Sequence, residues 1–175
     1  QTGRNDGLGA MTGAPALRVA NLSDRDAISA LLRRSYPVLL APDYDAETLA
    51  AALPHLTDAR PELVGSGRYF LAEAGAGHGG QCTLLSAGGW STDHPGTGTI
   101  TPGEGHVRHV VTDPAALRRG LARIIVGRCI DEARQAGIRR LTCLSTLTAV
   151  PFYAALGFAD DSPGAVTLPG GTRLP

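Results

Sequence analysis

One stretch, between residues 106 and 146, constrains the fold most because it alternates strand, glycine turn, long helix and strand. The β-branched run at 106–111 predicts a strand. Residues 120–135 predict a helix that Gly137 terminates as a C-terminal cap. Its apolar stripe consists of Leu121, Ile124, Ile125, Cys129 and Ala133. Residues 139–146 predict a second strand. A helix that joins two strands needs a sheet to pack on, which indicates an α/β or α+β fold.

The first part of the chain predicts one short strand and two helices. Residues 17–20 alternate as a strand, and Ser23 is a candidate cap for the helix that follows. Proline disrupts helix interiors, so Pro37 is expected to end this helix and open a loop over residues 36–45. Asp45 is then the candidate cap of the second helix.

The middle of the chain predicts a hairpin and a long loop. Residues 68–72 and 81–90 predict two antiparallel strands joined by the glycine-rich turn at 75–80. Residues 91–105 hold two prolines and four glycines and predict a loop, of a length usually connected with function or mobility.

The end of the chain predicts a short helix over 151–156, closed by Gly157, and a last strand over 165–168. No repeat or second boundary is visible in the element order, so we expect a single domain over residues 15–175. Residues 1–14 are expected to be a flexible N-terminal extension or an expression remnant. The predicted architecture is one mixed central sheet flanked by helices.

Charge and composition exclude several classes of function. The 16 basic residues balance 16 acidic residues, which disfavours a nucleic-acid partner held by a basic field. All 16 basic residues are arginine, so Schiff-base, Walker-type and kinase-type lysine chemistry is excluded. No apolar run is long enough for a membrane span.

The cysteines and histidines predict neither a disulfide framework nor a metal site. Cys82, Cys129 and Cys143 are odd in number and form no C-x-x-C pair, which favours a reducing, cytoplasmic setting. His106 and His109 are three residues apart on a predicted strand, so their side chains are expected on opposite faces. We therefore expect no metal.

The turn before the long helix is a candidate anion site. Gly120 allows a tight turn, and the free N–H groups of a first helical turn attract negative charge. Arg118, Arg119 and Arg123 surround this turn, so a phosphate or pyrophosphate is the natural ligand. A solvated helix face remains the alternative interpretation.

Two segments resemble the GNAT superfamily of N-acetyltransferases. Residues 110–123, Val-Val-Thr-Asp-Pro followed by Leu-Arg-Arg-Gly-Leu-Ala-Arg, resemble the acyl-CoA motif R/Q-x-x-G-x-G/A. Residues 150–158, Val-Pro-Phe-Tyr-Ala-Ala-Leu-Gly-Phe, resemble the second hallmark F-Y-x-x-L-G-F. The element order over 17–168 is also similar to the whole GNAT fold. One departure is Leu117, which occupies the R/Q position.

The resemblance implies that acetyl-CoA is the cosubstrate and lies where two parallel strands splay apart. Val110 and Val111 would offer backbone groups beside the thioester, and Ser145 is a candidate contact at the pantetheine end. Pyrophosphate would rest on backbone amides of the turn and helix start, formed by Arg118, Arg119, Gly120, Leu121, Ala122 and Arg123.

The resemblance also implies catalytic roles. Tyr153 occupies the position of the general acid that protonates the departing thiolate; the alternative is a core aromatic. Glu104 and His106 flank the position where related proteins place a general base, and both stay candidates. Cys143 as a nucleophile would need a base partner, so a packed thiol is the preferred interpretation.

The implied function is acetyl transfer to a primary amine of a small molecule or peptide. The alternative is a catalytically degenerate protein that binds an acyl-CoA or an amine as a sensor or sequestering module. Loops at 36–44 and 91–105 would form the acceptor pocket, in which Asp43, Asp45, Asp93 and Glu104 are candidate amine contacts. The family often forms homodimers, which this sequence leaves open.

Overall fold

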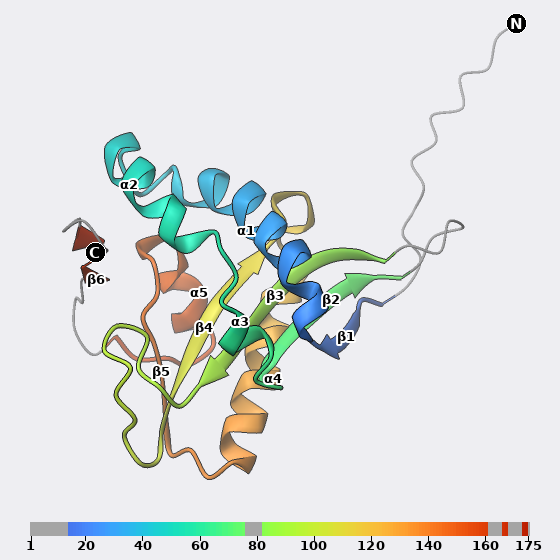
Figure 1. Ribbon diagram of the computed structural model, residues 1–175, viewed down its shortest axis with the longest axis vertical. Helices are drawn as coiled ribbons and strands as arrows, with labels where there is room; N and C mark the ends of the chain where they lie inside the picture. The colour runs from blue at the N-terminus through green and yellow to red at the C-terminus, as the bar shows by residue number, and fades with distance from the viewer. Residues whose placement is uncertain (1–13, 76–81, 161–165, 168–172, 175) are drawn as a thin grey trace, which may run out of the picture.

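The centre of the molecule is a five-stranded mixed sheet with the order β1-β2-β3-β4-β5 (Figure 1). The computed structural model describes residues 14–75, 82–160, 166–167 and 173–174. The strands are β1 (Ala16–Val19), β2 (Tyr69–Ala74), β3 (Thr83–Ser91), β4 (Glu104–Thr112) and β5 (Arg140–Cys143). Strands β1 to β4 pair antiparallel in succession, whereas β4 and β5 pair in parallel. The predicted mixed sheet, its hairpin and its parallel pair are therefore confirmed; most of the predicted turn at 75–80 lies outside the described residues.

Helices cover both faces of the sheet. In Figure 1, α1 and α3 lie in front of the sheet and α4 lies behind it. The helices are α1 (Arg25–Leu40), α2 (Ala46–Leu56), α3 (Pro61–Val64), α4 (Leu121–Gln135) and α5 (Val150–Ala155), with single 3-10 turns η1 (Leu22–Asp24), η2 (Pro114–Ala116) and η3 (Leu147–Ala149). Two apolar clusters join these layers: Ile28 and Leu31 of α1 pack with Val111, and Ile125 and Cys129 of α4 pack with Phe70. Burial of these faces is the main stabilising term of such a fold.

The first helix corrects the prediction at Pro37. α1 continues through Pro37 to Leu40, so the predicted stop and the loop over its first residues are wrong. Proline removes one helical N–H donor, yet Ser35 and Leu40 are buried on either side of it. The apolar contacts of this face outweigh one missing hydrogen bond, because helix stability in proteins comes mostly from packing.

Helix caps follow local hydrogen bonding. Asn21, and not Ser23, caps the first turn: its side chain accepts from the Ser23 N–H, while Asp24 accepts from the Asn21 N–H. The predicted cap of α2 is confirmed, since Asp45 Oδ1 accepts from the Thr48 N–H at 2.8 Å. A reciprocal pair of bonds satisfies two orphan donors, whereas a Ser23 cap would satisfy one.

Three predictions for the second half of the chain need correction. Ile124 was expected in the core stripe of α4 but is 44% exposed, and Val126 is fully buried in its place. The predicted strand over 139–146 ends at Cys143. Within the predicted last strand, β6 (Val166–Thr167) pairs antiparallel with a later strand, β7 (Arg173–Leu174), so it is not the last. Residues 165 and 168 lie outside the described part.

Strand β4 carries a β-bulge at its middle. Opposite β3 the register changes between the pairs Gly89–Arg108 and Ala87–Val111, and His109 has a φ of 47°. The extra residue turns Val107 toward α4 and Val111 toward α1, although regular alternation would place both on one face. Bulges redirect side chains, and this one separates the two halves of β4.

Gly88 lets α4 approach the bulge closely. A Cβ at this position would lie 2.8 Å from the Cγ2 atoms of both Ile125 and Val110. No larger residue fits without a shift of α4 or of β4. Gly88 is therefore a packing requirement of the bulge, whereas a Cβ at the neighbouring Gly89 would meet Arg68 and Tyr69 at the start of β2.

Candidate functional site

The candidate site is the gap that opens between β4 and β5. The two strands pair only up to Val107 and Cys143, after which β4 continues to Thr112 while the chain after β5 turns into η3. The β4 edge beyond Val107 is paired with no strand of the described part, so its outward N–H and C=O groups are available to an extended ligand. This gap confirms the predicted splay of the parallel pair.

A cavity of about 80 Å³ lies in the gap. Its walls come from four parts of the fold that the sequence places far apart. The lining residues are Tyr36 of α1, Val107, His109 and Val110 of β4, Cys143 of β5, the connecting residues Leu144, Ser145, Thr146 and Ala149, and Tyr153 of α5. Predicted site residues Val110, Ser145 and Tyr153 are thus brought together. Val111 lies one residue further, buried against α1.

Tyr153 is the buried hydroxyl of this cavity. Its side chain is 8% exposed and packs between the rings of Phe152 and Phe158. Burial, together with the neighbouring Cys143 thiol, raises the pKa of Tyr153 well above its ordinary value. Burial likewise raises the pKa of Cys143 to about 11, so this thiol is protonated at neutral pH. These surroundings keep the Tyr153 hydroxyl protonated and make Cys143 an inert thiol.

His109 lines the cavity without having been assigned to the site from sequence, and Tyr36 lines it too. Burial, then the charges of Arg108 and Arg60, lower the pKa of His109 to about 4, so its ring is neutral at pH 7. The backbone carbonyl of His109 accepts a hydrogen bond of 2.9 Å from the Tyr69 hydroxyl, which holds the bulge. Tyr36 belongs to the segment 36–44 that was predicted to form the acceptor pocket, but it lies on α1 and not on a loop, because α1 continues through Pro37. The sequence carries one sign of the bulge, because the alternation of polar and apolar residues in 106–111 breaks at Arg108 and His109.

The turn before α4 has the backbone that an anion site requires. Arg118 and Gly120 both have left-handed φ values, of 62° and 77°. No atom beyond the adjacent residues lies within 4 Å of where a Cβ of Gly120 would be, so the turn is open. The N–H groups of Leu121, Ala122 and Arg123 are in the first helical turn, where amides lack an intrahelical acceptor.

Charge and apolar surface surround this turn. Arg118, Arg119 and Arg123 are exposed, and none of them forms a salt bridge with another described residue. Leu117 and Ile124 beside them are 43% and 44% exposed. Such a surface fits a ligand that combines a phosphate with apolar groups.

Glu104 and His106 lie at the paired end of β4, outside the residues that line the cavity. Glu104 is 3.7 Å from Arg140. His106 is buried, its Nδ1 lies 2.7 Å from Thr142 Oγ1, and its ring contacts His94 edge-on. Burial and then the nearby His94 lower the pKa of His106, which favours a neutral ring. The structure therefore does not bring the two base candidates together with Tyr153.

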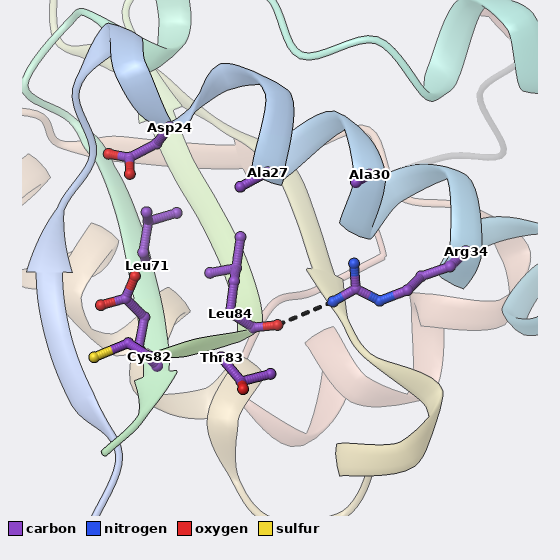
Figure 2. A pocket seen from close by; sticks show the side chains of 9 residues that line it. Asp24, Ala27, Ala30, Arg34, Leu71, Cys82, Thr83 and Leu84 are labelled. Atoms are coloured by element: carbon purple, nitrogen blue, oxygen red, sulfur yellow. Dashed lines mark hydrogen bonds between the residues drawn. The ribbon is translucent and has the colours of Figure 1, made fainter. Parts of the chain in front are cut away.

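A larger cavity, of about 430 Å³, lies on another part of the molecule (Figure 2). It is bounded by α1 and by β2 and β3, with Arg34 and Leu84 on one side and Asp24 and Cys82 on the other. Its charged groups already have partners: Arg34 pairs with Asp113 at 2.7 Å, and Asp24 and Glu73 both pair with Arg18.

Within the described ranges, a metal-binding cluster and a membrane-spanning helix are both absent. No group of three or more His, Cys, Asp or Glu side chains there is arranged to hold a metal ion. Among the helices of the described part, none has the length and apolar character needed to cross a membrane.

Comparison with known proteins agrees with this fold. Residues 90–167 match the family model described as an acetyltransferase (GNAT) domain. The rice protein glucosamine 6-phosphate N-acetyltransferase 1 (Oryza sativa subsp. japonica) is 38% identical over 58 residues, which are 33% of this chain and 35% of that protein. The matched segment thus spans about a third of that relative.

Solved structures share the fold over nearly the whole chain. A GNAT-type N-acetyltransferase from Rhodopseudomonas palustris superposes with a TM-score of 0.72 at 20% identity, covering 93% of this chain and 91% of that one. The PaiA N-acetyltransferase of Thermoplasma acidophilum, solved with coenzyme A, has a TM-score of 0.64 at 11% identity, covering 93% and 96%.

The described part of the chain therefore has the fold of GNAT-type N-acetyltransferases. Within that fold, residues 90–167 are similar to the acetyltransferase (GNAT) domain family.

Proposed function

We propose that this protein is an N-acetyltransferase that moves an acetyl group from acetyl-CoA to a primary amine of a small molecule or peptide by direct attack. The observation that carries the proposal is the gap between β4 and β5, because an unpaired strand edge and the open turn at Gly120 lie at the same end of β4. The rice relative is named for acetylation of an amino sugar phosphate, and the Thermoplasma structure holds coenzyme A.

The residues present fit an acetyl-CoA donor. Backbone amides of Gly120, Leu121, Ala122 and Arg123 would hold its pyrophosphate, with Arg118, Arg119 and Arg123 as the compensating charges. Leu117, which replaces the expected Arg or Gln, is exposed beside the turn and offers apolar contact instead of a hydrogen bond. The pantetheine chain would pair with the free edge of β4 and contact Ser145.

The proposed reaction needs a neutral amine, polarisation of the thioester carbonyl and a proton for the leaving thiolate. The amine nitrogen forms a bond to the carbonyl carbon and the C–S bond breaks. The backbone around Val110 and Val111 would donate to the developing oxyanion. Tyr153 would give its hydroxyl proton to the thiolate; its raised pKa keeps that proton in place until the thiolate forms.

The proton released by the ammonium needs a separate path. Glu104 and His106 remain the predicted bases, and His106 has the neutral ring that a base requires. Neither lines the cavity, so transfer to either residue would pass through water.

The first test is a calorimetric titration with acetyl-CoA of the wild type, Gly120→Glu and Gly137→Glu. Both glycines are exposed, have φ values of 77° and 80°, and lie at opposite ends of α4. The two variants therefore carry the same charge and comparable backbone strain. Loss of binding by at least about 100-fold in Gly120→Glu alone supports the donor site. Absence of binding to the wild type contradicts the proposal.

Turnover distinguishes an enzyme from a binding protein. With an amine panel, an acetyltransferase releases free coenzyme A with at least one acceptor. Tight donor binding without release for any amine favours the sensor or sequestering alternative, which the replacement at Leu117 would suit.

A further inference from the structure

The segment between α1 and α2 closes over the mouth of the β4/β5 gap. The Leu147 N–H donates to the Tyr44 hydroxyl at 2.8 Å, and the Thr148 hydroxyl donates to Asp43 Oδ2 at 2.7 Å. Leu147 and Thr148 belong to η3, between the cavity residues Thr146 and Ala149. Two hydrogen bonds between residues more than a hundred positions apart therefore place Asp43 at this mouth.

Asp43 differs from the other three acidic residues expected near the acceptor. Asp45 is used as the cap of α2, Asp93 pairs with Arg108 at 3.1 Å, and Glu104 lies beside Arg140. Asp43 is exposed, and the side-chain partner that the structure gives it is the neutral hydroxyl of Thr148. A carboxylate whose partner is a neutral hydroxyl keeps an uncompensated negative charge, so a cationic donor, which adds Coulomb attraction to the hydrogen bond, competes well for it.

Asp43 and Tyr153 lie at different depths. The Tyr153 side chain is 8% exposed at the inner wall of the cavity, whereas Asp43 is on the surface. A cation held by Asp43 is therefore a different group from the amine that reacts beside Tyr153. Leu144 lines the cavity and Leu147 precedes the Asp43 partner Thr148; each is 46% exposed and provides apolar surface for a hydrocarbon spacer.

We propose that Asp43 is a specificity residue that binds a second, remote positive charge of the acceptor, so that the preferred acceptors are alkyl diamines or longer polyamines. In the acceptor-bound state the remote ammonium replaces the Thr148 hydroxyl on Asp43, the methylene chain contacts Leu144 and Leu147, and the other amine enters the gap. This inference rests on the proposed function of the gap.

The test compares 1,5-diaminopentane with 1-aminopentane, which has the same chain and lacks the second charge. We expect the wild type to prefer the diamine in kcat/KM by about tenfold, mainly through KM. Asp43→Asn removes that preference and leaves the KM for acetyl-CoA within about twofold. Glu47→Gln, a neighbouring exposed carboxylate in α2, is the charge control and retains the preference.

The variant Thr148→Val distinguishes cation binding by Asp43 from a purely structural role of the Thr148–Asp43 hydrogen bond. This variant frees Asp43 of its competing donor, so the diamine preference is retained or increased. If Thr148→Val loses the preference as Asp43→Asn does, or if the wild type shows no preference, the inference is overturned.

Binding keeps this inference distinct from the proposed function. Calorimetric titration of the two amines into each variant is independent of turnover. Diamine binding that depends on Asp43 without any acetyl transfer supports the site and contradicts the enzyme. Acetyl transfer to amines with an unchanged diamine-to-monoamine ratio in Asp43→Asn supports the enzyme and overturns the site.

Discussion

The two cavities described above differ in whether the polar groups around them already have hydrogen-bond or ion-pair partners, and their volumes do not reveal this difference. The cavity between α1 and strands β2 and β3 has a volume of about 430 Å³, and the cavity in the β4/β5 gap has about 80 Å³. In the larger one, Asp24, Glu73 and Arg34 are already committed to ion pairs. The smaller one adjoins an unpaired strand edge and a bulge, and a left-handed turn follows the same end of β4.

Polar groups without hydrogen-bond partners, rather than cavity volume, distinguish a candidate site from a packing defect. A polar group with a good partner gains little from a ligand, whereas an unpaired strand edge or helix start gains a full set of hydrogen bonds. The backbone irregularities at His109, Arg118 and Gly120 all fall in the second region. Strained backbone gathers at functional sites because the surrounding structure must hold it there.

The largest expected effect concerns Tyr153. Tyr153→Phe should lower kcat by about 100-fold and leave acetyl-CoA binding nearly unchanged, because the ring packing remains and only the proton donor is lost. Steady-state kinetics with a calorimetric titration measure both. Tyr36→Phe, in the same cavity, should lower kcat by less than about threefold; an equal loss in both variants would count against the assignment.

Acid should destabilise the gap before it affects the larger cavity. The pKa of His109 is about 4 in the folded protein and about 6.5 in the unfolded chain, so the unfolded state binds more protons between these values. The stability that this neutral ring contributes is present above pH 6.5 and falls as the pH decreases toward 4. We expect a loss of about 1–2 kcal/mol at pH 5, discounted because the ring is partly exposed.

A matched variant isolates the contribution of His109. His109→Asn keeps a side chain that tolerates the left-handed backbone and removes the titration. Urea unfolding at pH 7 and pH 5 should show a smaller difference for the variant than for the wild type. The Asp24 carboxylate of the larger cavity, whose pKa the Arg18 hydrogen bond lowers, should lose its contribution only below about pH 4.

A smaller effect is expected from restoring the family residue at position 117. Leu117→Arg adds a cationic donor beside the turn and should tighten acetyl-CoA binding by about threefold, a modest gain because the position is exposed. Ile100→Arg, an exposed residue in the loop before β4, controls for added charge. Equal tightening in both variants would point to a general field instead of a local contact.

The smallest effect is expected in the larger cavity. Glu73→Gln breaks one of the two ion pairs of Arg18 and should lower the free energy of unfolding by about 0.5–1 kcal/mol. Turnover should stay within about twofold of wild type. A substantial loss of kcat/KM would show that the larger cavity takes part in the reaction, and the distinction drawn between the two cavities would then be wrong.

Much of the fold was predictable because it depends on local patterns. Gly120 and Gly137, both in the left-handed conformation, mark the two ends of α4, and the helical spacing of apolar residues between them located the helix. The predicted buried face was wrong at Ile124, which is exposed. The end of α1 was predicted wrongly at Pro37, since the burial of Leu40 and Ser35 stabilises the helix by more than the missing proline N–H costs. The shortened β5 was also unpredictable, because the strand pattern continues through residues that turn away from β4.

The candidate site likewise has parts that were predictable from local sequence and parts that were not. The motifs around Gly120 and Tyr153 were visible as sequence, since each depends on neighbours a few positions away. Glu104 and His106 were chosen by counting along a strand, and counting cannot show that they lie outside the cavity. Asp43 was one of four equivalent acidic residues until the fold gave three of them other partners.

The sequence by itself determined the class of fold, the glycine turn before α4 and the aromatic segment around Tyr153, because helix spacing, glycine conformations and short motifs act over a few residues. The tertiary structure decided the rest: the gap, the neutral His109 and the joining of Asp43 to Thr148 across more than a hundred positions. Burial and long-range hydrogen bonds create these features, and both depend on which distant segments meet.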